Sequence, residues 1–284
     1  LDVVRDRGLA LPPGLLTTDA KQVLTDPSID IVIELIGGCD VAKRVILEAI
    51  AAGKHVVTAN KALLALHGEE IFAAASRSGV DLGFEASVGG GIPVIQALRE
   101  GLAANTIQSI YGIINGTANY ILSRMTRAGQ SFELVLDEAK QAGYAEADPT
   151  FDVAGIDSAH KLAILASLAY GTPVNVKDVY TEGITHITPL DIAYAKEFDC
   201  TIKLLGIAKL VGNEVEARVH PTMLPSSSPI AQVEGVYNAI QLVGDAVGAV
   251  VLYGRGGGSL LTGSAVGGDL MAIARNLLKG AVGR

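Results

Sequence analysis

The sequence has 284 residues, of which 49 % are hydrophobic, so it can bury the core of one large domain or two ordinary ones and is not a disordered chain. Its formal net charge of −8 is spread without long runs of one sign, which argues against nucleic acid or an anionic membrane as the main partner. No apolar stretch reaches the ~18 residues that a membrane span needs. The two cysteines, Cys39 and Cys200, have no metal-like spacing, and we expect free thiols in a cytoplasmic protein.

The first predicted unit is a strand, a helix and a second strand. Residues 28–38, SIDIVIELIGG, form an apolar and β-branched run that is typical of a strand buried on both faces of a parallel sheet. A helix is predicted over 40–53, and the chain becomes extended again over 55–58. Ligands bind beyond the carboxyl ends of parallel strands, so the loops 37–38 and 59–61 are expected to face a site.

The alternation continues with a helix at about 69–78 and a strand at 80–85, after which the pattern changes. We expect an α/β fold in which residues 1–88 form an incomplete Rossmann-type parallel sheet, with residues 262–284 packing back on it. Residues 89–261 are expected to form a second, α+β domain for substrate binding, catalysis and dimerisation. Its predicted elements are a helix at 93–103, a strand at 106–114, a buried helix at 158–170, and a mixed sheet with strands near 201–211, 214–223, 237–243 and 247–253.

A paired lysine is the strongest candidate for chemistry. Asp157 and Lys161 lie four residues apart on the predicted buried helix and are therefore neighbours on one face. Burial is costly for a lysine unless it is paired, and it lowers the pKa of the ammonium group toward the range that is useful for proton transfer. The alternative is an ordinary ion pair. The carboxylates of Glu146, Asp148 and Asp152 in the preceding loop favour a functional site over that alternative.

Lys61 is the second candidate, because it follows the carboxyl end of a predicted parallel strand, with Thr58 and Asn60 beside it. A lysine there could orient a carboxylate or polarise a carbonyl. On spacing alone, a solvated lysine in the first turn of a helix is the more common arrangement. The five histidines show neither H-x-H nor H-E-x-x-H spacing, which argues against a catalytic zinc site.

Two glycine-rich stretches permit close approaches of the backbone. The first runs from Glu85 to Pro93 and contains three consecutive glycines, which could serve close packing or could turn main-chain carbonyls toward a hard cation. Spacing alone favours packing. In the second, Gly254 and Gly256 begin a dinucleotide-type fingerprint, but the following parallel strand with its acidic residue is lacking, so this signal is weak.

Seven motifs, in order along essentially the whole sequence, resemble homoserine dehydrogenase. The most specific is GYAEADPTFDVAGIDSAHKL at 143–162; the others are VVTANKALLA, FEASVGGGIP, GIINGTANYIL, IKLLGIAKL, EARVHPTMLP and YGRGGGSLLTGSAVGGDL. The resemblance implies an NAD(P)-dependent oxidoreductase that interconverts L-aspartate 4-semialdehyde and L-homoserine, in the pathway to threonine, methionine and isoleucine.

The same resemblance implies roles for individual residues. Lys161 would be the catalytic proton donor or acceptor, and Lys61 would lie close to both substrate and nicotinamide. The substrate would meet the carboxylates of Asp157, Glu146 and Asp152. The implied cofactor contacts are Thr58, Ala59, Asn60, Lys61, Gly143 and Gly256. Sodium or a similar monovalent cation would be held by the main-chain oxygens of Glu85, Val88, Gly90 and Ile92.

The sequence departs from the family pattern at both ends. The family begins with a strand and a G-x-G-x-x-G turn that cradles the pyrophosphate, whereas this sequence begins with LDVVRDRG, which resembles the end of the second strand. We therefore expect the N-terminal strand and phosphate loop, and also the C-terminal ACT-type domain of many members, to be missing. Arg5 favours NADP, with NAD tolerated, because an arginine after this strand can meet a 2′-phosphate; the neighbouring Asp6 weakens that inference.

Two other functions are compatible with the residues. A lyase or aldolase could use Lys161 as a Schiff-base nucleophile, and the incomplete cofactor half would also suit a non-catalytic oligomerisation or ligand-sensing module. The apolar strands NAIQLVG and AVVLYG offer a surface to a symmetric partner, so we expect a homodimer.

Overall fold

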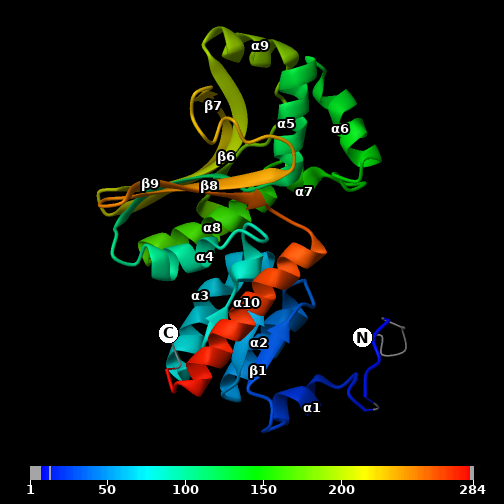
Figure 1. Cartoon of the computed structure of the whole chain (residues 1–284), viewed down its shortest axis with the longest axis vertical. Helices are drawn as coiled ribbons and strands as arrows, with labels where there is room; N and C mark the ends of the chain where they lie inside the picture. Colours follow the sequence, from blue (N-terminus) through cyan, green and yellow to red (C-terminus); the bar gives the residue numbers. More distant parts are fainter. Residues whose placement is uncertain (1–7, 13, 282–284) are drawn as a thin grey trace.

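The computed structural model describes residues 8–12 and 14–281 and places them in two halves that lie end to end (Figure 1). One half contains a three-stranded sheet with strand order β1-β2-β3, and the other contains a six-stranded sheet with order β5-β7-β6-β4-β8-β9. The predicted α/β class, with one parallel and one mixed sheet, is confirmed. The largest cluster of buried apolar side chains includes residues of both halves, so the core is continuous between them.

The parallel sheet follows the predicted βαβ pattern. Its strands are β1 (Ile31–Glu34), β2 (His55–Thr58) and β3 (Leu82–Gly83), with α1 (Ala20–Thr25) before them and α2 (Asp40–Ala51) and α3 (Lys61–Ser78) between them. All four residues of β2 are buried, as expected for a middle strand that is covered on both faces. Ile46 of α2 is completely buried in the core.

Three elements in and directly after this half differ from the prediction. Helix α3 begins at Lys61 rather than near residue 69, because the side-chain oxygen of Asn60 accepts a hydrogen bond from Leu63 N at 3.1 Å and caps the helix there. Strand β3 has two residues instead of six, since the chain turns at Phe84 into the 3₁₀ helix η1 (Glu85–Ser87). The helix predicted at 93–103 is divided into α4 (Val94–Gln96) and a π-helical turn, η2 (Ala97–Gly101).

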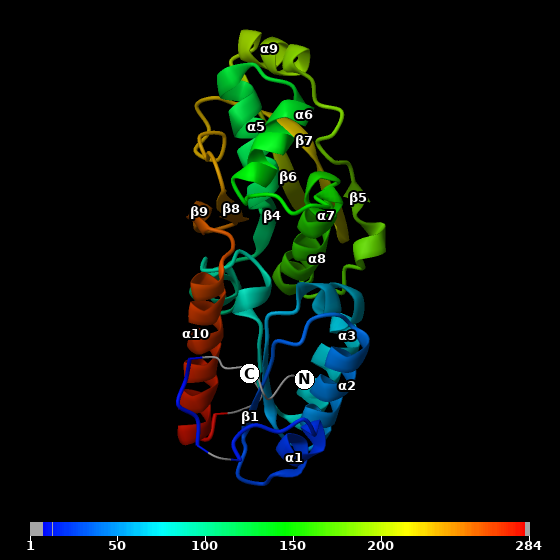
Figure 2. The same cartoon turned by 90° about the vertical axis from the view of Figure 1, so that its right-hand side faces the viewer.

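The C-terminal helix α10 (Ser259–Leu278) lies against the parallel sheet, on the side opposite α2 and α3 (Figure 2). Its Val266 and Ile273 share an apolar cluster with Val57 of β2. A polar contact fixes it further, because the Asp269 carboxylate accepts a hydrogen bond from Glu85 N at 2.9 Å. The end of the described chain therefore completes the second face of the first sheet.

The six-stranded sheet is antiparallel except for one short parallel pair. Its strands are β4 (Ile107–Ile113), β5 (Tyr180–Thr181), β6 (Cys200–Val211), β7 (Glu214–Pro225), β8 (Tyr237–Gly244) and β9 (Gly248–Arg255). Only β5 pairs in parallel, with β7. The five longer strands agree with the predicted ones to within a few residues, because turns with glycine separate them clearly in the sequence, whereas the two-residue β5 carried no such signal.

Helices cover and extend this second sheet. They are α5 (Gly116–Ala128), α6 (Phe132–Gln141), α7 (Thr150–Val153), α8 (Ile156–Tyr170), the 3₁₀ turn η3 (Val176–Asp178) and α9 (Pro189–Glu197). Helix α8 packs against β6 and β7 and also against α3 of the other half. It ends at Tyr170, as the sequence predicts, and Gly171 follows in a left-handed conformation. No helix in the described part of the chain is both long and apolar enough to span a bilayer.

The approach of α10 to β3 depends on a glycine. A Cβ atom added at Gly83 would lie 2.7 Å from the Cβ of Asp269, closer than real side chains pack. We predict that Gly83→Ala lowers the free energy of unfolding by about 1–3 kcal/mol, because α10 must move outward. Gly267→Ala in α10 is the control: nothing lies within 4 Å of its added Cβ, so stability should stay unchanged or rise by up to ~1 kcal/mol. Urea unfolding of both variants measures this, and equal midpoints for Gly83→Ala and the unaltered chain would contradict the close packing.

Candidate active site

The two lysines singled out from the sequence meet at one carboxylate. Lys61 is the first residue of α3 and Asp157 the second of α8, and the Lys61 ammonium donates to Asp157 Oδ1. Lys161, one turn further along α8, donates to Asp157 Oδ2 at 2.7 Å. Asp157 therefore bridges two ammonium groups, one from each half of the molecule.

Lys161 is nearly inaccessible to water. Its residue is 8 % exposed, and its ammonium also donates to the carbonyl oxygen of Ile114 at 2.8 Å. Burial lowers the pKa of Lys161, while the Asp157 carboxylate opposes that shift and nearby Lys61 adds to it. The predicted desolvated, carboxylate-paired lysine is thus present, and its ammonium is a better proton donor than that of a solvated lysine.

Asp157 responds to the two lysines in the opposite sense. Burial raises the pKa of its carboxyl group, but Lys161 and Lys61 together outweigh burial and lower the pKa to about 2. Asp157 is therefore ionised throughout the neutral range. It compensates the buried positive charge and fixes where both ammonium groups point.

Sequence reasoning missed Asn115, which organises the carboxylates. Its amide nitrogen donates to Asp157 Oδ2 at 2.9 Å and to Asp152 Oδ1 at 2.7 Å. Its side-chain oxygen accepts from Ala118 N at 2.8 Å, so the same residue is the N-cap of α5. The available signal was an asparagine between an apolar strand and a helix that starts with glycine and threonine.

The other carboxylates of the predicted site are placed differently. Asp152 reaches the cluster through Asn115. Glu146 is exposed, and within the described residues no hydrogen bond or ion pair joins it to either lysine. Asp148 is also exposed, and its carboxylate accepts a hydrogen bond from Thr150 N at 3.1 Å, so it supports the start of α7.

A small cavity of about 230 Å³ opens beside the lysines. It is lined by Ala59, Lys61, Ala86, Ser87, Gly89, Gly90, Lys161, Gly256, Gly257 and Thr262. The predicted strand-end loop, the first glycine stretch and the glycine loop before α10 therefore meet at one place. A larger cavity of about 630 Å³ lies between α3 and the C-terminal half of α8, and neither lysine lines it.

Two family models match the sequence: the homoserine dehydrogenase model over residues 93–271, and the NAD-binding domain of homoserine dehydrogenase over residues 3–85. The homoserine dehydrogenase of Pseudomonas aeruginosa is 54 % identical over 92 % of this chain and 60 % of that protein. The chain belongs to the homoserine dehydrogenase family. The homoserine dehydrogenase of Bacillus subtilis is 44 % identical over 99 % of this chain and 65 % of that protein.

Solved structures give the same result. The crystal structure of a homoserine dehydrogenase from Thiobacillus denitrificans superposes with a TM-score of 0.90 at 54 % identity, covering 93 % of this chain and 61 % of that one. A hyperthermophilic archaeal homoserine dehydrogenase in complex with NADPH superposes with a TM-score of 0.78 at 28 % identity, over 92 % and 76 % of the two chains. The chain spans about three fifths of the length of the first curated homoserine dehydrogenases that it matches.

Some of the residues expected to contact the cofactor line the small cavity, and others hold together the strand ends next to it. Ala59, Lys61 and Gly256 line the cavity, whereas Gly143 does not. Thr58 is buried and donates to Glu34 Oε2 at 2.8 Å, and Asn60 donates to Gly38 O at 2.7 Å. These two side chains tie the ends of β1 and β2 together. Arg5 and Asp6, on which the NADP preference rests, lie outside the described residues.

Glu34 is a second residue that sequence reasoning missed. It is 1 % exposed, and its carboxylate accepts hydrogen bonds from Ile36 N at 2.6 Å and Gly37 N at 3.2 Å in addition to the Thr58 hydroxyl. It therefore shapes the loop after β1. An acidic residue at the end of an otherwise apolar strand was the signal that could have indicated it.

The first glycine stretch bends sharply beside the cavity. Gly89 and Gly90 both have left-handed φ angles, 76° and 60°, and a Cβ added at Gly90 would lie 2.6 Å from Gly256 C. The Glu85 carboxylate accepts from Ile95 N and Gln96 N, each at 2.8 Å. Its side chain thus caps the helical turn that follows, while its main-chain oxygen accepts a hydrogen bond from Val88 N at 3.4 Å. The described residues contain no group of three or more His, Cys, Asp or Glu that could hold a metal ion.

The charge bridge predicts how stability depends on pH. The pKa of Asp157 is about 2 in the folded chain, below its ordinary value of 3.8, so its contribution to stability is present above pH ~4 and is lost as the pH falls toward 2. Asp157→Asn should therefore flatten the stability profile in this window by about 2 kcal/mol. It should also cost about 3–5 kcal/mol at neutral pH, because Lys161 is left buried without its counter-ion.

The control for that prediction is Asp137→Asn on α6, which replaces an exposed carboxylate in the same way. It should leave the profile unchanged. Urea unfolding at pH values between 2 and 7 measures both variants. A profile for Asp157→Asn that parallels that of the unaltered chain would refute the charge bridge.

Proposed function

We propose that this chain is the nucleotide-binding and catalytic part of a homoserine dehydrogenase, which interconverts L-aspartate 4-semialdehyde and L-homoserine with a nicotinamide dinucleotide. It would act in the pathway to threonine, methionine and isoleucine. One observation carries the proposal: Asp157 holds the ammonium groups of Lys61 and Lys161 together at the cavity that both lysines line. Membership of the family supports the choice of substrate.

The lysines supply the proton chemistry of this reaction. A nicotinamide ring, when bound, supplies or accepts the hydride. Negative charge develops on the aldehyde oxygen during reduction, and Lys161, with its pKa lowered by burial, donates the proton that converts this oxygen into the hydroxyl. In the oxidation direction, neutral Lys161 accepts the hydroxyl proton. Lys61, which is more exposed, orients and polarises the carbonyl.

The carboxylates bind and orient the amino acid. Asp157 keeps both lysines in place, and Asp152, held by Asn115, offers a carboxylate oxygen to the substrate ammonium. Glu146 lies on the exposed loop before α7 and would reach the same ammonium only from that loop. We assign substrate binding to Asp152 and Asp157 at the cluster and to Glu146 at its edge.

The residues around the small cavity fit a flat nicotinamide ring. Gly89, Gly90, Gly256 and Gly257 give it walls without side chains, and Lys161 lies at the same cavity. We assign cofactor binding to Thr58, Ala59, Asn60, Lys61, Gly143 and Gly256. We propose NADP, with NAD accepted, on the sequence argument from Arg5. The family match to an NAD-binding domain supports a nicotinamide cofactor of either kind.

We also propose a monovalent cation, sodium, at the main-chain oxygens of Glu85, Val88, Gly90 and Ile92. The left-handed conformations of Gly89 and Gly90 support this assignment, because they let successive carbonyl groups turn to one side. Hard cations prefer such oxygen ligands. The cation would stiffen the segment that separates β3 from α4.

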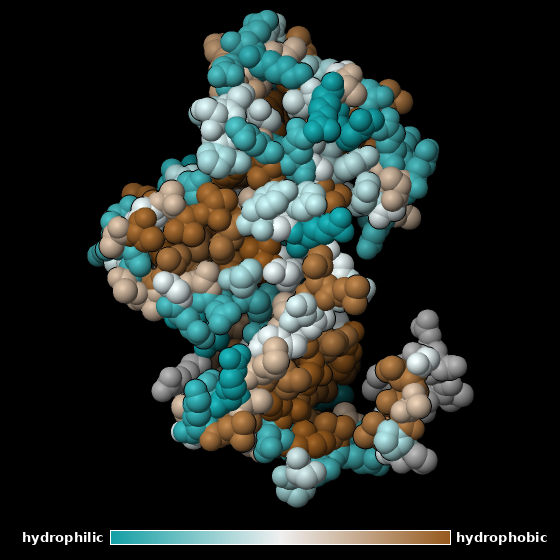
Figure 3. Space-filling model, in the orientation of Figure 1, coloured by the Kyte–Doolittle hydropathy of each residue, from teal (hydrophilic) through white to brown (hydrophobic). Residues whose placement is uncertain are grey.

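A homodimer and a cytoplasmic location complete the proposal. An apolar surface covers β8 and β9 (Figure 3), where Val251 and Tyr253 are exposed. Strand β9 is also an edge of the six-stranded sheet. A second copy would bury both. Cys39 and Cys200 are free thiols, which is in keeping with a reducing compartment.

Substitution of Lys161 tests the assigned proton donor. Lys161→Ala in the full chain should lower kcat about 10²–10⁴-fold and change the pH dependence of turnover, because the proton for the substrate oxygen is lost. Lys43→Ala, which removes a partly exposed lysine from an ion pair with Glu70, is the control and should keep normal turnover. Near-normal turnover of Lys161→Ala with an unchanged pH profile would refute the assignment. Borohydride trapping of substrate on Lys161 would instead favour the Schiff-base lyase.

Exchange of the salt tests the cation. Sodium chloride should raise the melting temperature of the chain in a saturable way relative to choline chloride at the same ionic strength, because a bound ion stabilises only the folded state. Differential scanning fluorimetry over a range of concentrations measures this. Identical melting curves in the two salts would contradict a specific site, and a linear, unsaturating rise would show only a general salt effect.

A further inference from the structure

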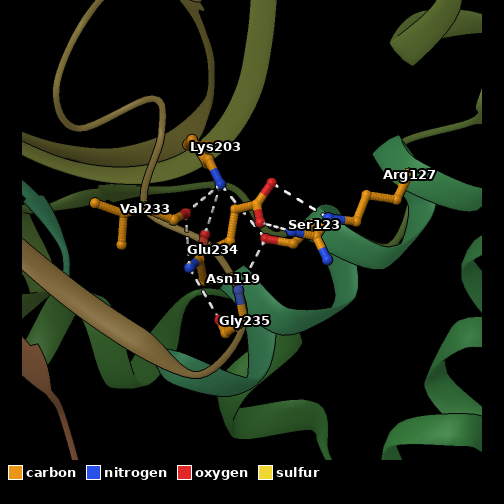
Figure 4. Close-up of polar contacts among 7 residues, drawn as sticks. All are labelled: Asn119, Ser123, Arg127, Lys203, Val233, Glu234 and Gly235. Carbon is orange, nitrogen blue, oxygen red and sulfur yellow. Dashed lines mark hydrogen bonds and ion pairs between the residues drawn. The ribbon is translucent and has the colours of Figure 1, made fainter.

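A second lysine, Lys203 of β6, is buried far more completely than its chemistry favours. It is 1 % exposed, and its ammonium donates to Asn119 Oδ1 at 3.1 Å, to Ser123 Oγ at 3.4 Å and to the carbonyl oxygen of Val233 (Figure 4). Within the described residues no hydrogen bond or ion pair joins it to a carboxylate. Its three N–H groups are thus matched by three neutral acceptors.

Burying the Lys203 ammonium without a carboxylate partner among the described residues lowers the stability of the fold, so we expect this lysine to have a function that would explain why it is buried. Burial, together with the positive charge of Arg127, lowers the pKa of Lys203 to about 8. Arg127 itself forms an exposed ion pair with Glu234, and these two are the other charged side chains drawn in Figure 4. A methionine of similar length would avoid the desolvation of a charge.

The partners of Lys203 hold a turn against helix α5. Asn119 of α5 donates through its side-chain nitrogen to three carbonyl oxygens at the turn that leads into β8: those of Val233 at 3.2 Å, Gly235 at 3.0 Å and Tyr237, the first residue of β8, at 3.2 Å. The Lys203 ammonium binds the remaining side-chain oxygen of Asn119, which fixes the orientation of the amide. Lys203 therefore secures the group that clamps this turn.

The clamp lies next to the start of α5. The turn packs so closely that a Cβ added at Gly116 would lie 2.8 Å from the carbonyl oxygen of Val236. Asn119 N also donates to the carbonyl oxygen of Asn115 at 3.3 Å, so one helical turn links the clamp to the N-cap. Asn115 in turn donates to the carboxylate of Asp157. A rigid path of hydrogen bonds thus leads from β6 to the charge bridge.

We propose that Lys203 is a positioning residue of the active site, which acts through Asn119 and the first turn of α5 to hold Asn115 against Asp152 and Asp157. The proposal rests on the proposed function insofar as Asp157 orients the catalytic lysines. Lys203 does not line the small cavity beside Lys61 and Lys161. Its effect on turnover arises from geometry alone.

The first test is Lys203→Met in the full chain. We expect kcat to fall about tenfold to a hundredfold, because a misplaced catalytic group loses this much. The pH profile of kcat should shift in the same direction as in Asn115→Ala, a shift that a loss of stability alone would not produce. Lys209→Met is the matched control: it makes the same change on the same face of the same strand, at a lysine that lies over the Tyr111 ring, and should leave kcat and its pH profile unchanged.

A double variant decides whether the effect passes through Asn115. If Lys203 acts as proposed, Lys203→Met combined with Asn115→Ala should be no slower than Asn115→Ala alone. Multiplying effects of the two substitutions, or an unchanged kcat in Lys203→Met, would overturn the proposal. If Lys203→Met does not fold, Lys203→Gln, which keeps a polar N–H donor, is assessed by the same criteria.

Hydrogen–deuterium exchange, which does not depend on turnover, tests the positioning role of Lys203 separately from the proposed enzymatic function. The Ala118 amide donates to Asn115 Oδ1 at 2.8 Å, so its hydrogen–deuterium exchange reports on the cap of α5. Exchange should be faster in Lys203→Met, or in Lys203→Gln, than in Lys209→Met, even in a chain that turns over no substrate. Equal exchange in the lysine variants would overturn the positioning role, whereas absent turnover with a changed exchange would count against the proposed function only.

Discussion

The structure depends on one carboxylate that serves two ammonium groups. Lys61 comes from the parallel-sheet half and Lys161 from the other half, and both donate to Asp157. A buried ammonium without a counter-ion is strongly unfavourable, so the position of Asp157 constrains where α3 and α8 can begin. The two halves therefore meet in a geometry that is set by charge as well as by apolar packing. The cavity beside them follows from the same geometry, since both lysines line it.

Short polar side chains at the ends of strands make that geometry rigid. Asn60 caps α3 directly before Lys61, and Asn115 caps α5 while it holds Asp157. Glu34 fixes the loop after β1 and binds the hydroxyl of Thr58. Each of these side chains accepts hydrogen bonds from backbone N–H groups at the start of a helix or in the loop after a strand. Local hydrogen-bond requirements and placement of the active site are thus met by the same side chains.

The sequence predicted the elements that have a clear period and missed those that depend on distant contacts. The strands at 201–211 and 237–243 and the buried helix around Lys161 were found because apolar residues recur at strand or helix spacing between glycines. The start of α3 was misplaced because the cap at Asn60 outweighs the weak period of its first turns. The end of the short β3 and the turn before α4 involve the Glu85 carboxylate, which binds Ile95 N and Gln96 N ten and eleven residues away, and no local pattern reveals these contacts.

The candidate active site was also predictable only where its residues are close in the sequence. Spacing brought Asp157 and Lys161 together, because residues four apart on a helix are neighbours wherever that helix lies. Nothing in the spacing of Lys61, 96 residues earlier, indicates that it binds the same carboxylate. The sequence around Asn115 indicates only the start of a helix, and that around Lys203 indicates no special role, since each residue joins segments far apart in the chain.

The two buried lysines show why a lowered lysine pKa alone does not define an active site. Lys161 has a charged partner and lies at a cavity, so its proton can be exchanged with a bound molecule while Asp157 keeps the site electrostatically balanced. Lys203 has only neutral acceptors. It lines neither the small cavity beside Lys61 and Lys161 nor the larger cavity between α3 and α8. Both have a lowered pKa from the same cause, burial. A lowered pKa becomes catalytic only where a substrate atom can reach the proton, and elsewhere the same ammonium can only hold backbone and side-chain oxygens in place.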